Sequence, residues 1–570
     1  MAHVITQACC NDASCVPVCP VDAIHPTPDE PGYGRSEMLY IDPVGCIDCG
    51  ACIDACPVDA IVPDYDLTPQ TERYEEVNAA YYSRGKSVAP EPPPTAAVPV
   101  PALRSGLLRV AIVGSGPSAC YAAEELLSQN GGAVEISVFE KLPTPFGLIR
   151  FGVAPDHQGT KSVAKMFQKT ASHKNLDFYL NVEVGRHISH EELLEHHDAV
   201  IYAVGAPGDQ KLGIPGEELP GCHSATEFVA WYNGHPDHAD RKFDLSGERA
   251  VIIGNGNVAL DVARVLVSDP AALVRTDIAQ HALEALAESN IKEVVVVGRR
   301  GPAQAAFTNP ELLGLGLLPD VDVTAPAGEV ELDEHTQAIL ASHPDPIAEL
   351  KARLVAEHSI DRSPSAARRI ALRFLLSPMQ IRGTERVAGV RFARNELISG
   401  ADGSLAAMPT ASLEDFECGL ILRSVGYRGV PVAGFPVSGS RATLKNAGGR
   451  VLDSRSGAPI PGVYTAGWIK RGPSGVIGTN KKCASETIAN LLEDFHAGCL
   501  ASPQRDRGHL RDLVCDRQPE AFDYAGWKAI DSHERRTGRA SGRPRVKLVD
   551  TRQMLDIAVA SERPRGATAK

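Results

Sequence analysis

The stretch VAIVGSGPSACYAAEEL, residues 110–126, decides the fold of the larger part of the chain. An apolar run leads into Gly114, Gly116 and Ala119, and a pattern typical of a helix follows. Glycines at this spacing permit a tight turn and let a pyrophosphate approach the N-terminus of the helix. The next expected strand ends in Glu140, where an acid in such folds binds ribose hydroxyls. We therefore predict a dinucleotide-binding fold, with Glu140 as a ribose ligand rather than a solvated strand end.

A second stretch, AVIIGNGNVALDVARVL at residues 250–266, repeats the pattern with Gly254 and Gly256. The later run EVVVVG is followed by Arg299 and Arg300 instead of an acid. Arginines after a strand are often only solvated, but two guanidinium groups suit a 2′-phosphate better than a ribose diol. We predict that the first fold binds FAD and the second binds NADP(H). Two such folds in one chain imply electron transfer between them.

Between residues 108 and 500, short β-branched runs alternate with helical patterns, which is typical of βαβ units and parallel sheets. The runs FLLSPMQIRG, AGVRFARNEL and CGLILRSVGY lack long helices between them and predict an antiparallel meander before the chain returns to GVYTAGW. The final 60 or so residues are polar and are predicted as helices. The expected divisions are 108–208 (first part of the FAD-binding domain), 209–425 (NADP-binding domain with the meander), 426–500 (second part of the FAD-binding domain) and 501–570 (C-terminal extension).

The first 61 residues differ from the rest in composition. They hold eight of the 14 cysteines, and nine acids against one base, Arg35, give them a net charge of −8 out of −14 for the chain. CCNDASCVPVCPVDAI (9–24) aligns with CIDCGACIDACPVDAI (46–61) at a shift of 37 residues. Without a signal-peptide pattern, dense cysteine favours metal over disulfides. The acidic balance opposes binding to nucleic acid or anionic membrane and favours basic partners.

The second repeat contains CxxCxxCxxxCP, in which three thiolates reach three irons of one cluster and the cysteine before proline ligates the other cluster. This rule assigns one cluster, a [4Fe–4S], to Cys19, Cys46, Cys49 and Cys52. It assigns the other to Cys9, Cys15 and Cys56, with Asp12 or nothing at the fourth corner, as a [3Fe–4S] or a labile [4Fe–4S] cluster. Zinc is a weaker alternative, because seven cysteines would serve two ions. Cys10 is most simply a spare thiol.

Residues 1–61 resemble a bacterial ferredoxin with two clusters, which implies a small α+β domain. Residues 62–107 include PEPPPTAAVPVPALRSG, which can form neither a helix interior nor a central strand. We predict a Pro-rich linker that spans roughly 40 Å as flexible coil, enough for one domain to dock on its neighbour.

From Gly114 to about Lys482 the chain resembles the adrenodoxin reductase type of NADPH-ferredoxin reductase, in the motifs VGSGPSA, EKLPTPFGLIRFGVAPDH, IGNGNVALDVAR, RRGPAQAAFT, SVGYRG and AGWIKRGPSGVIGTNK. With residues 1–61 included, it is similar to bacterial proteins in which a ferredoxin is fused to such a reductase. The resemblance implies FAD contacts at Glu140, Leu148, Val184, Trp468, Gly475, Val476 and Ile477. It implies NADP contacts at Asn255, Gly256, Asn257, Val258, Arg299, Arg300, Glu311 and Gly475. The family's basic residue near the NADP entrance matches Gln210 here, so that contact is not carried over.

Three further side chains have two interpretations each. Trp468 is either a flavin contact or an ordinary core aromatic. His157, in APDHQ, is a candidate catalytic residue for proton balance near the flavin, although a lone histidine is more often structural and hydride transfer requires no acid or base. A basic run near the C-terminus is predicted to help dock an acidic ferredoxin: Arg535, Arg536, Arg539, Arg543, Arg545 and Lys547.

The leading hypothesis is a ferredoxin–NADP reductase in which hydride passes from NADPH to FAD, and single electrons then pass to the clusters and on to an external ferredoxin or other acceptor protein. Disulfide reduction is excluded because none of the six cysteines beyond residue 61 lies in a CxxC. Two alternatives stay open: a subunit similar to the small subunit of glutamate synthase, and an N-terminal domain whose clusters serve only assembly. We expect a cytoplasmic protein without membrane spans.

Overall fold

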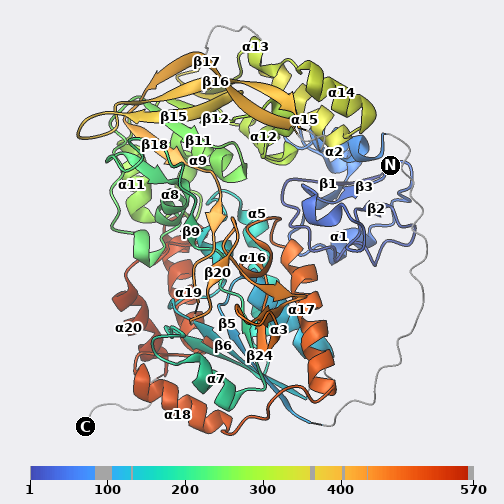
Figure 1. Ribbon diagram of the computed structural model, residues 1–570, viewed down its shortest axis with the longest axis vertical. Coiled ribbons are helices and arrows are strands. Elements are labelled where there is room, and N and C mark those ends of the chain that lie inside the picture. The colour runs from blue at the N-terminus through green and yellow to red at the C-terminus, as the bar shows by residue number, and fades with distance from the viewer. Residues whose placement is uncertain are drawn as a thin grey trace.

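The computed structural model describes residues 2–83, 106–129, 133–359, 366–400, 405–432 and 434–562. Two sheet-based domains lie one above the other in Figure 1, and the smaller N-terminal domain lies beside the junction between them. This arrangement confirms the predicted fold class, a small α+β domain joined to two dinucleotide-binding domains.

The first dinucleotide-binding domain is built on a seven-stranded sheet in the order β22-β23-β24-β8-β5-β6-β7. Its strands are β5 (Leu108–Val113), β6 (Val134–Glu140), β7 (Leu176–Leu180), β8 (Ala199–Tyr202), β22 (Asn446–Ala447), β23 (Arg450–Leu452) and β24 (Pro459–Thr465). The strands from β24 to β7 are parallel and buried on both faces, which explains their near-continuous apolar sequence. Helices α3 (Pro117–Gln129) and α17 (Thr479–His496) pack together on one face, and α7 (His190–His196) lies on the other.

The second dinucleotide-binding domain has an all-parallel sheet in the order β10-β18-β11-β12-β14-β13. Its strands are β10 (Cys222–Ser224), β11 (Arg249–Ile253), β12 (Glu293–Val297), β13 (Val321–Thr324), β14 (Arg368–Arg373) and β18 (Leu420–Arg423). Its main helices are α8 (Ala225–Tyr232), α9 (Asn257–Val267), α11 (Gln280–Ala287), α12 (Asn309–Leu315), α14 (Glu334–Ser342) and α15 (Pro346–Glu357). The chain enters and leaves this domain through β9 (Gly208–Asp209) and β19 (Tyr427–Arg428), which pair with each other.

The predicted meander is partly wrong. An antiparallel sheet of β15 (Leu376–Arg382), β16 (Gly389–Ser399) and β17 (Leu405–Glu417) covers one face of the parallel sheet. The run CGLILRSVGY is not its third strand: it supplies β18, which lies between β10 and β11 inside the parallel sheet. The actual third strand, β17, is mostly polar and exposed, so it lacks the apolar signal of a strand.

The N-terminal domain has a twofold-repeated pattern of strands. β1 (His3–Ile5) pairs with β4 (Ile61–Pro63), and β2 (Ile24–His25) pairs with β3 (Tyr40–Ile41), so each repeat contributes one strand to each pair. A short helix, α1 (Ala51–Ala55), lies between β3 and β4.

The predicted linker over residues 62–107 is too long at its start. The chain continues past Ile61 into α2 (Arg73–Tyr82), which packs on β1, β3 and α15. Asn78 in α2 accepts from the amides of Ile5 and Ile41 and so fixes the helix to both strand pairs. Residues 62–83 therefore belong to the N-terminal domain, and most of the Pro-rich segment lies outside the described residues.

The C-terminal extension forms α18 (Arg507–Arg517), α19 (Tyr524–Ala540) and α20 (Thr551–Glu562), which lie along the first dinucleotide-binding domain (Figure 1). The predicted docking role of its basic run is not supported, because Arg543 and Lys547 are buried and Arg545 forms ion pairs with Asp531 and Glu534. Among the described helices, none is both long and apolar enough to cross a bilayer.

A buried triad of charged side chains, one from each dinucleotide-binding domain and one from the extension, joins these three parts of the chain. Asp277 lies between Lys161 and Lys547, at 2.6 and 3.1 Å, and all three side chains are at least nine-tenths buried. Burial alone would raise the pKa of Asp277, but the two ammonium groups lower it well below the ordinary value. The carboxylate is therefore ionised whenever the protein is folded near neutral pH.

We expect Asp277→Ala to lower the free energy of unfolding by about 3–5 kcal/mol, because it leaves two buried cations unpaired. Asp237→Ala is the matched control: its pair with Lys141 is exposed on both sides and should contribute less than about 1 kcal/mol. Urea titrations at neutral pH measure both. Because the folded pKa is lowered, the contribution of Asp277 is present above the unfolded carboxyl pKa of about 3.9 and is lost as pH falls below it. Equal effects of the two substitutions would contradict this account.

Candidate functional site

The sequence repeat of the N-terminal domain is also present in its backbone. Residues with left-handed φ occur at equivalent places, 37 residues apart: Asn11 and Asp48, Ala13 and Gly50, Asp22 and Asp59. In both halves an amide donates to the last cysteine, from Ala23 to Cys19 Sγ at 3.3 Å and from Ala60 to Cys56 Sγ at 3.2 Å. Peptide N–H groups directed at Sγ atoms are the hydrogen bonds that tune thiolate ligands of iron–sulfur clusters.

The first predicted ligand group lies deep in the domain. The pKa of Cys9 is raised to about 11 by burial, and nearby Cys56 and Asp12 contribute to the rise. Burial also raises the pKa of Cys15, and Cys9, Asp12, Cys56 and Cys52 contribute to the rise. The structure thus brings together the three cysteines and the aspartate that the crossing rule assigned to one cluster. Buried thiols with raised pKa values stay protonated unless a metal replaces the proton, so this group fits a metal cluster.

The second predicted ligand group borders the surface. Cys19, Cys46, Cys49 and Cys52 line one cavity, which also includes His3. The pKa of Cys52 is raised to about 11 by burial and by the three neighbouring cysteines, whereas Cys49 is exposed to solvent. Four thiols around one cavity fit a cluster with a complete set of cysteine ligands.

Asp12 and Cys10 have partners that the sequence did not indicate. The Asp12 carboxylate accepts from the amide of Ser14 at 3.2 Å and also from its hydroxyl group. Lys481 lies 4.0 Å from the same carboxylate. The side chain of Cys10 is buried in the apolar core of the first dinucleotide-binding domain, away from the surface.

The glycine-rich loop after β5 is shaped for a close backbone approach. Gly114 has φ of +99°, and a Cβ there would lie 2.6 Å from the carbonyl oxygen of Ala203. Gly116 has no atom within 4 Å of its Cβ direction, so a pyrophosphate has room there. Ala119 is buried in the first turn of α3. Glu140, at the end of β6, is buried and accepts from the amide and hydroxyl of Ser115 at 3.1 and 2.6 Å, so it is not a solvated strand end.

Four of the predicted FAD contacts lie in α16 (Trp468–Arg471) and the loop that follows it: Trp468, Gly475, Val476 and Ile477. Trp468 is half-buried, its ring lies 5.0 Å from that of Tyr427, and its indole N–H donates to Ser474 at 3.2 Å. Gly475 has φ of +75°, and Val476 donates its amide to Thr479. Val476 and Ile477 are half-buried, as is Val184, and Leu148 begins α4 (Leu148–Phe151) with its side chain exposed. Tyr427 had no sequence signal beyond its place in SVGYRG.

The second glycine loop repeats the first. Gly254 has φ of +115°, and a Cβ there would meet the carbonyl of Ser424 at 2.1 Å, whereas the nearest atom to a Cβ on Gly256 would be the Cβ of Ala306 at 4.0 Å. The Asn257 side chain accepts from the amide of Thr308 at 2.8 Å and ties the loop to the segment after β12. Asn255 packs against Gly298, and Val258 is half-buried in α9.

Arg299 and Arg300 follow β12 as a pair of cations. Arg299 is exposed and Arg300 is half-buried, and burial together with the charge of Arg299 lowers the pKa of Arg300. Within the described part of the chain, neither guanidinium forms an ion pair with an acid, unlike many other arginines. Two adjacent cations without an acidic partner form a fitting site for a phosphate dianion.

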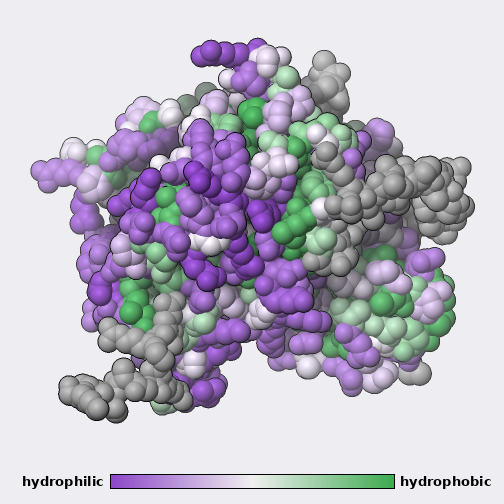
Figure 2. All heavy atoms as spheres, turned by 90° about the horizontal axis from the view of Figure 1, so that it is seen from below, coloured by the Kyte–Doolittle hydropathy of each residue, from purple (hydrophilic) through white to green (hydrophobic). Residues whose placement is uncertain are grey.

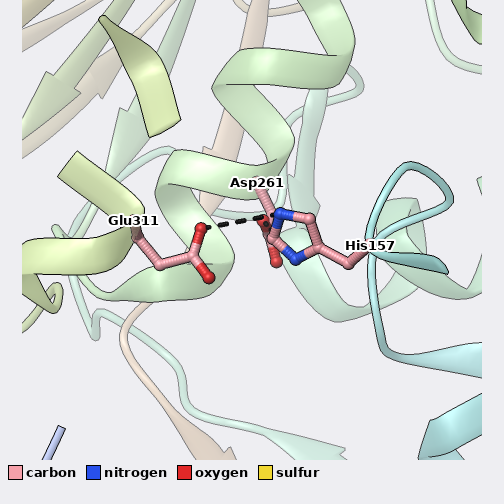
Figure 3. A group of neighbouring side chains, drawn as sticks. All are labelled: His157, Asp261 and Glu311. Atoms are coloured by element: carbon pink, nitrogen blue, oxygen red, sulfur yellow. Dashed lines mark ion pairs between the residues drawn. The ribbon is translucent and has the colours of Figure 1, made fainter. Parts of the chain in front are cut away.

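His157 lies in a charge cluster where the two dinucleotide-binding domains meet (Figure 3). Its Nε2 is 3.9 Å from Glu311, and its Nδ1 is 4.0 Å from Asp261 of α9. Arg264, which the sequence analysis did not single out, donates to Nε2 at 2.8 Å and pairs with Asp156 at 2.7 Å. Because a guanidinium only donates, Nε2 accepts and the ring proton is on Nδ1.

Glu311 lies at the edge of this cluster rather than in open space. Burial raises its pKa, and the nearby charge of Asp261 raises it further. Gln7 of the N-terminal domain also reaches the cluster, with its side-chain nitrogen 3.4 Å from His157 Nε2. Three domains therefore meet around one imidazole.

The loop that carries Cys9 and Cys10 packs against the loop that precedes α17. The amide of Gly478 donates to the carbonyl of Cys10 at 2.6 Å. A Cβ on Gly478 would lie 2.1 Å from the carbonyl carbon of Asn11, so the two backbones touch directly. This contact brings the first ligand group against the predicted flavin-binding loop.

The N-terminal domain is also held by the second dinucleotide-binding domain. Glu37 pairs with Lys351 of α15 at 2.8 Å and accepts from the amide of Asn309 at 2.7 Å. Arg73 of α2 pairs with Glu357 at 2.7 Å. The apolar core of the N-terminal domain is continuous with that of the second dinucleotide-binding domain, so docking rests on packing as well as on charge.

Comparisons with known proteins agree with this division. Residues 8–60 match the family model of a 4Fe-4S dicluster domain, and residues 108–301 match that of a pyridine nucleotide-disulphide oxidoreductase.

Relatives are known for the whole chain and for its larger part. A probable ferredoxin/ferredoxin--NADP reductase of Mycobacterium tuberculosis is 51% identical over 570 residues, covering 98% of this chain and 96% of that protein. The NADPH-ferredoxin reductase FprA of the same species is 46% identical over 462 residues, covering 79% of this chain and 99% of that protein. The solved structure of Mycobacterium tuberculosis FprA in complex with NADPH has a TM-score of 0.74 and 45% identity, again over 79% of this chain and 99% of that one. Since half of its residues are shared with such a protein along nearly its whole length, the chain belongs to the ferredoxin/ferredoxin--NADP reductase family, as an oxidoreductase that passes electrons from NADPH through FAD to the iron–sulfur centres of its own ferredoxin domain.

Proposed function

We propose that the ferredoxin domain is reduced within the same molecule, through its first cluster site, and that it delivers electrons to an external protein acceptor. The observation that carries the proposal is the contact between Gly478 and the Cys10 carbonyl, because it joins the flavin-binding loop to the loop of Cys9, Asp12 and Cys15. The relatives that span the chain are ferredoxin reductases, which favours this function over that of a glutamate-synthase-like subunit.

When bound, FAD accepts a hydride from NADPH and releases electrons singly, which suits iron–sulfur centres that carry one electron each. We assign the binding tasks to the chain as follows. Gly116 and Gly256 leave room for the two pyrophosphates, Glu140 accepts from the FAD ribose hydroxyls, and Arg299 with Arg300 binds the 2′-phosphate of NADPH.

His157 has a positioning role in this scheme. Arg264 donates a hydrogen bond to its Nε2, and the carboxylates of Asp156 and Asp261 accept hydrogen bonds from Arg264. The ring is therefore fixed between the flavin-side and NADP-side domains, and its role as a proton donor stays a prediction.

The first prediction from the proposed function concerns coenzyme choice. Replacing Arg299 and Arg300 together by Ala should raise the KM for NADPH by about 10–100-fold, because charge-assisted contacts to the 2′-phosphate contribute roughly 1.5–3 kcal/mol. The KM for NADH, which lacks this phosphate, should stay nearly unchanged. Steady-state kinetics with both coenzymes measure the effect, with the exposed Arg386→Ala as a control. Equal losses with NADPH and NADH would refute the assignment.

The second prediction concerns the docked loop. Gly478→Ala should slow the bleaching of the clusters by NADPH at least tenfold, because the new Cβ would overlap the backbone of Asn11 and push the ferredoxin domain away. Gly478 has φ of −70°, so the backbone itself tolerates Ala. Reduction of the flavin by NADPH, followed in the same stopped-flow traces, should be slowed much less than the bleaching. Gly328→Ala, where a Cβ meets nothing within 4 Å, is the matched control.

In the unmodified protein the bleaching rate should not depend on protein concentration, since donor and acceptor are tethered at an effective concentration on the order of millimolar. A rate that rises in proportion to protein concentration would show transfer between molecules and contradict the proposal.

The third prediction concerns Asp12. A carboxylate is a harder and weaker ligand for this iron than a thiolate, and here Ser14 and Lys481 compete for it. We expect a three-iron cluster in protein handled in air and a four-iron form under reduction with added iron. Asp12→Cys should convert the site to a stable four-iron cluster of lower potential, whereas the exposed Asp29→Asn should change nothing. Electron paramagnetic resonance distinguishes the forms. Oxidised protein without a three-iron signal, together with an Asp12→Ala spectrum like that of the unmodified protein, would show that another group completes the cluster.

A further inference from the structure

The two cluster sites of the ferredoxin domain have different surroundings. The group of Cys9, Cys15 and Cys56 is covered by the reductase, since the adjoining Cys10 and Asn11 touch Gly478. The group of Cys19, Cys46, Cys49 and Cys52 lines a cavity at the opposite end of the repeat, where Cys49 is exposed. An external protein therefore has access to the second group, and the reductase occupies the approach to the first.

Four large apolar side chains are exposed within two residues of Cys19 or Cys46 along the chain, and we call them the apolar collar: Val18, Val21, Val44 and Ile47. Val44 is 92% exposed and Ile47 is 58% exposed, and Val21 and Ile47 line the same cavity as the cysteines. In Figure 2 the lobe at the lower right, where the ferredoxin domain projects beyond the reductase, carries a gathering of apolar residues on a largely hydrophilic molecule. Large apolar side chains held in water around a redox site are typical of a protein contact.

The acidic side chains near the collar indicate which kind of partner protein suits this surface. Asp22 follows Val21 and is exposed, and Asp54 is exposed on α1. Arg35 is the one lysine or arginine in the first 61 residues, and Glu37 is already paired with Lys351 of the reductase. The outward face is thus apolar at its centre and acidic around it, which is complementary to a basic protein surface with an apolar centre.

We propose that this collar is the electron exit, and that its partner is a one-electron carrier protein whose redox centre lies under an apolar surface ringed by lysine or arginine. The inference rests on the proposed function, in which the first cluster site receives electrons from the reductase. One electron leaves the Cys19 group and reduces one acceptor centre, no proton or covalent bond is exchanged, and each NADPH supplies two such transfers.

The test uses the full-length holoprotein and ferric cytochrome c, a small basic haem protein, as the probe. Val44→Lys should lower the second-order rate constant of cytochrome c reduction about tenfold at low salt, because it places a charge of the partner's own sign on the proposed docking surface. Val44→Glu should lower it much less, since the added charge is complementary. Met408→Lys on β17, which replaces an exposed apolar side chain of the second dinucleotide-binding domain, should leave it unchanged. Salt should slow the unmodified protein.

Bleaching of the clusters by NADPH is measured in the same preparations and should be equal in all variants. If the unmodified protein shows no bleaching, the proposed function fails. If bleaching is intact but Val44→Lys reduces cytochrome c as fast as the unmodified protein, the exit lies elsewhere and only this inference is overturned. If Val44→Lys and Val44→Glu are equally slow, or if salt has no effect, the basic partner is wrong.

Discussion

The missing side chain at Gly478 is the constraint on which the electron route depends. With a hydrogen in place of a methyl group, the loop before α17 reaches hydrogen-bond distance of the Cys10 carbonyl, and the backbones of the two domains touch. The same loop belongs to the sequence GPSGVIG that resembles a flavin-binding segment. One close approach therefore serves both the flavin side and the ferredoxin side, and any side chain at this position would separate them.

The acidic charge of the ferredoxin domain is divided between two tasks. Glu37 faces inward and pairs with Lys351 in a setting where both side chains are nearly buried, so its charge is used in docking. Asp22 and Asp54 are exposed to solvent, where the proposed partner would meet them. A net charge of −8 alone does not distinguish these tasks, and only the position of α15 beside the second half of the domain does. Some acidic side chains of the tethered domain thus hold it on the reductase, and others remain exposed to solvent.

Much of the fold follows from local patterns. The glycine loops at Gly114 and Gly254 and the buried strands before them were predicted because a tight turn and a parallel sheet each leave a signature within about ten residues. The assignment of CGLILRSVGY failed because an apolar strand next to a meander in sequence need not be next to it in space. The polar strand β17 and the helix α2, which precedes a Pro-rich segment, have no comparable signature.

The sequence predicted which cysteines form each ligand group better than it predicted which residues surround a functional side chain. The cysteine spacing predicted two ligand groups, and the structure gathers the same side chains because the repeat places equivalent left-handed turns around each group. The cluster around His157 had no such signal, since Arg264 joins it from 107 positions away and Gln7 from 150. Gln7 belongs to the ferredoxin domain, so the imidazole between the two dinucleotide-binding domains is held partly by the third. The geometry of the junction between the nucleotide domains therefore depends in part on how the ferredoxin domain is docked. Displacing that domain removes Gln7, a neighbour of His157.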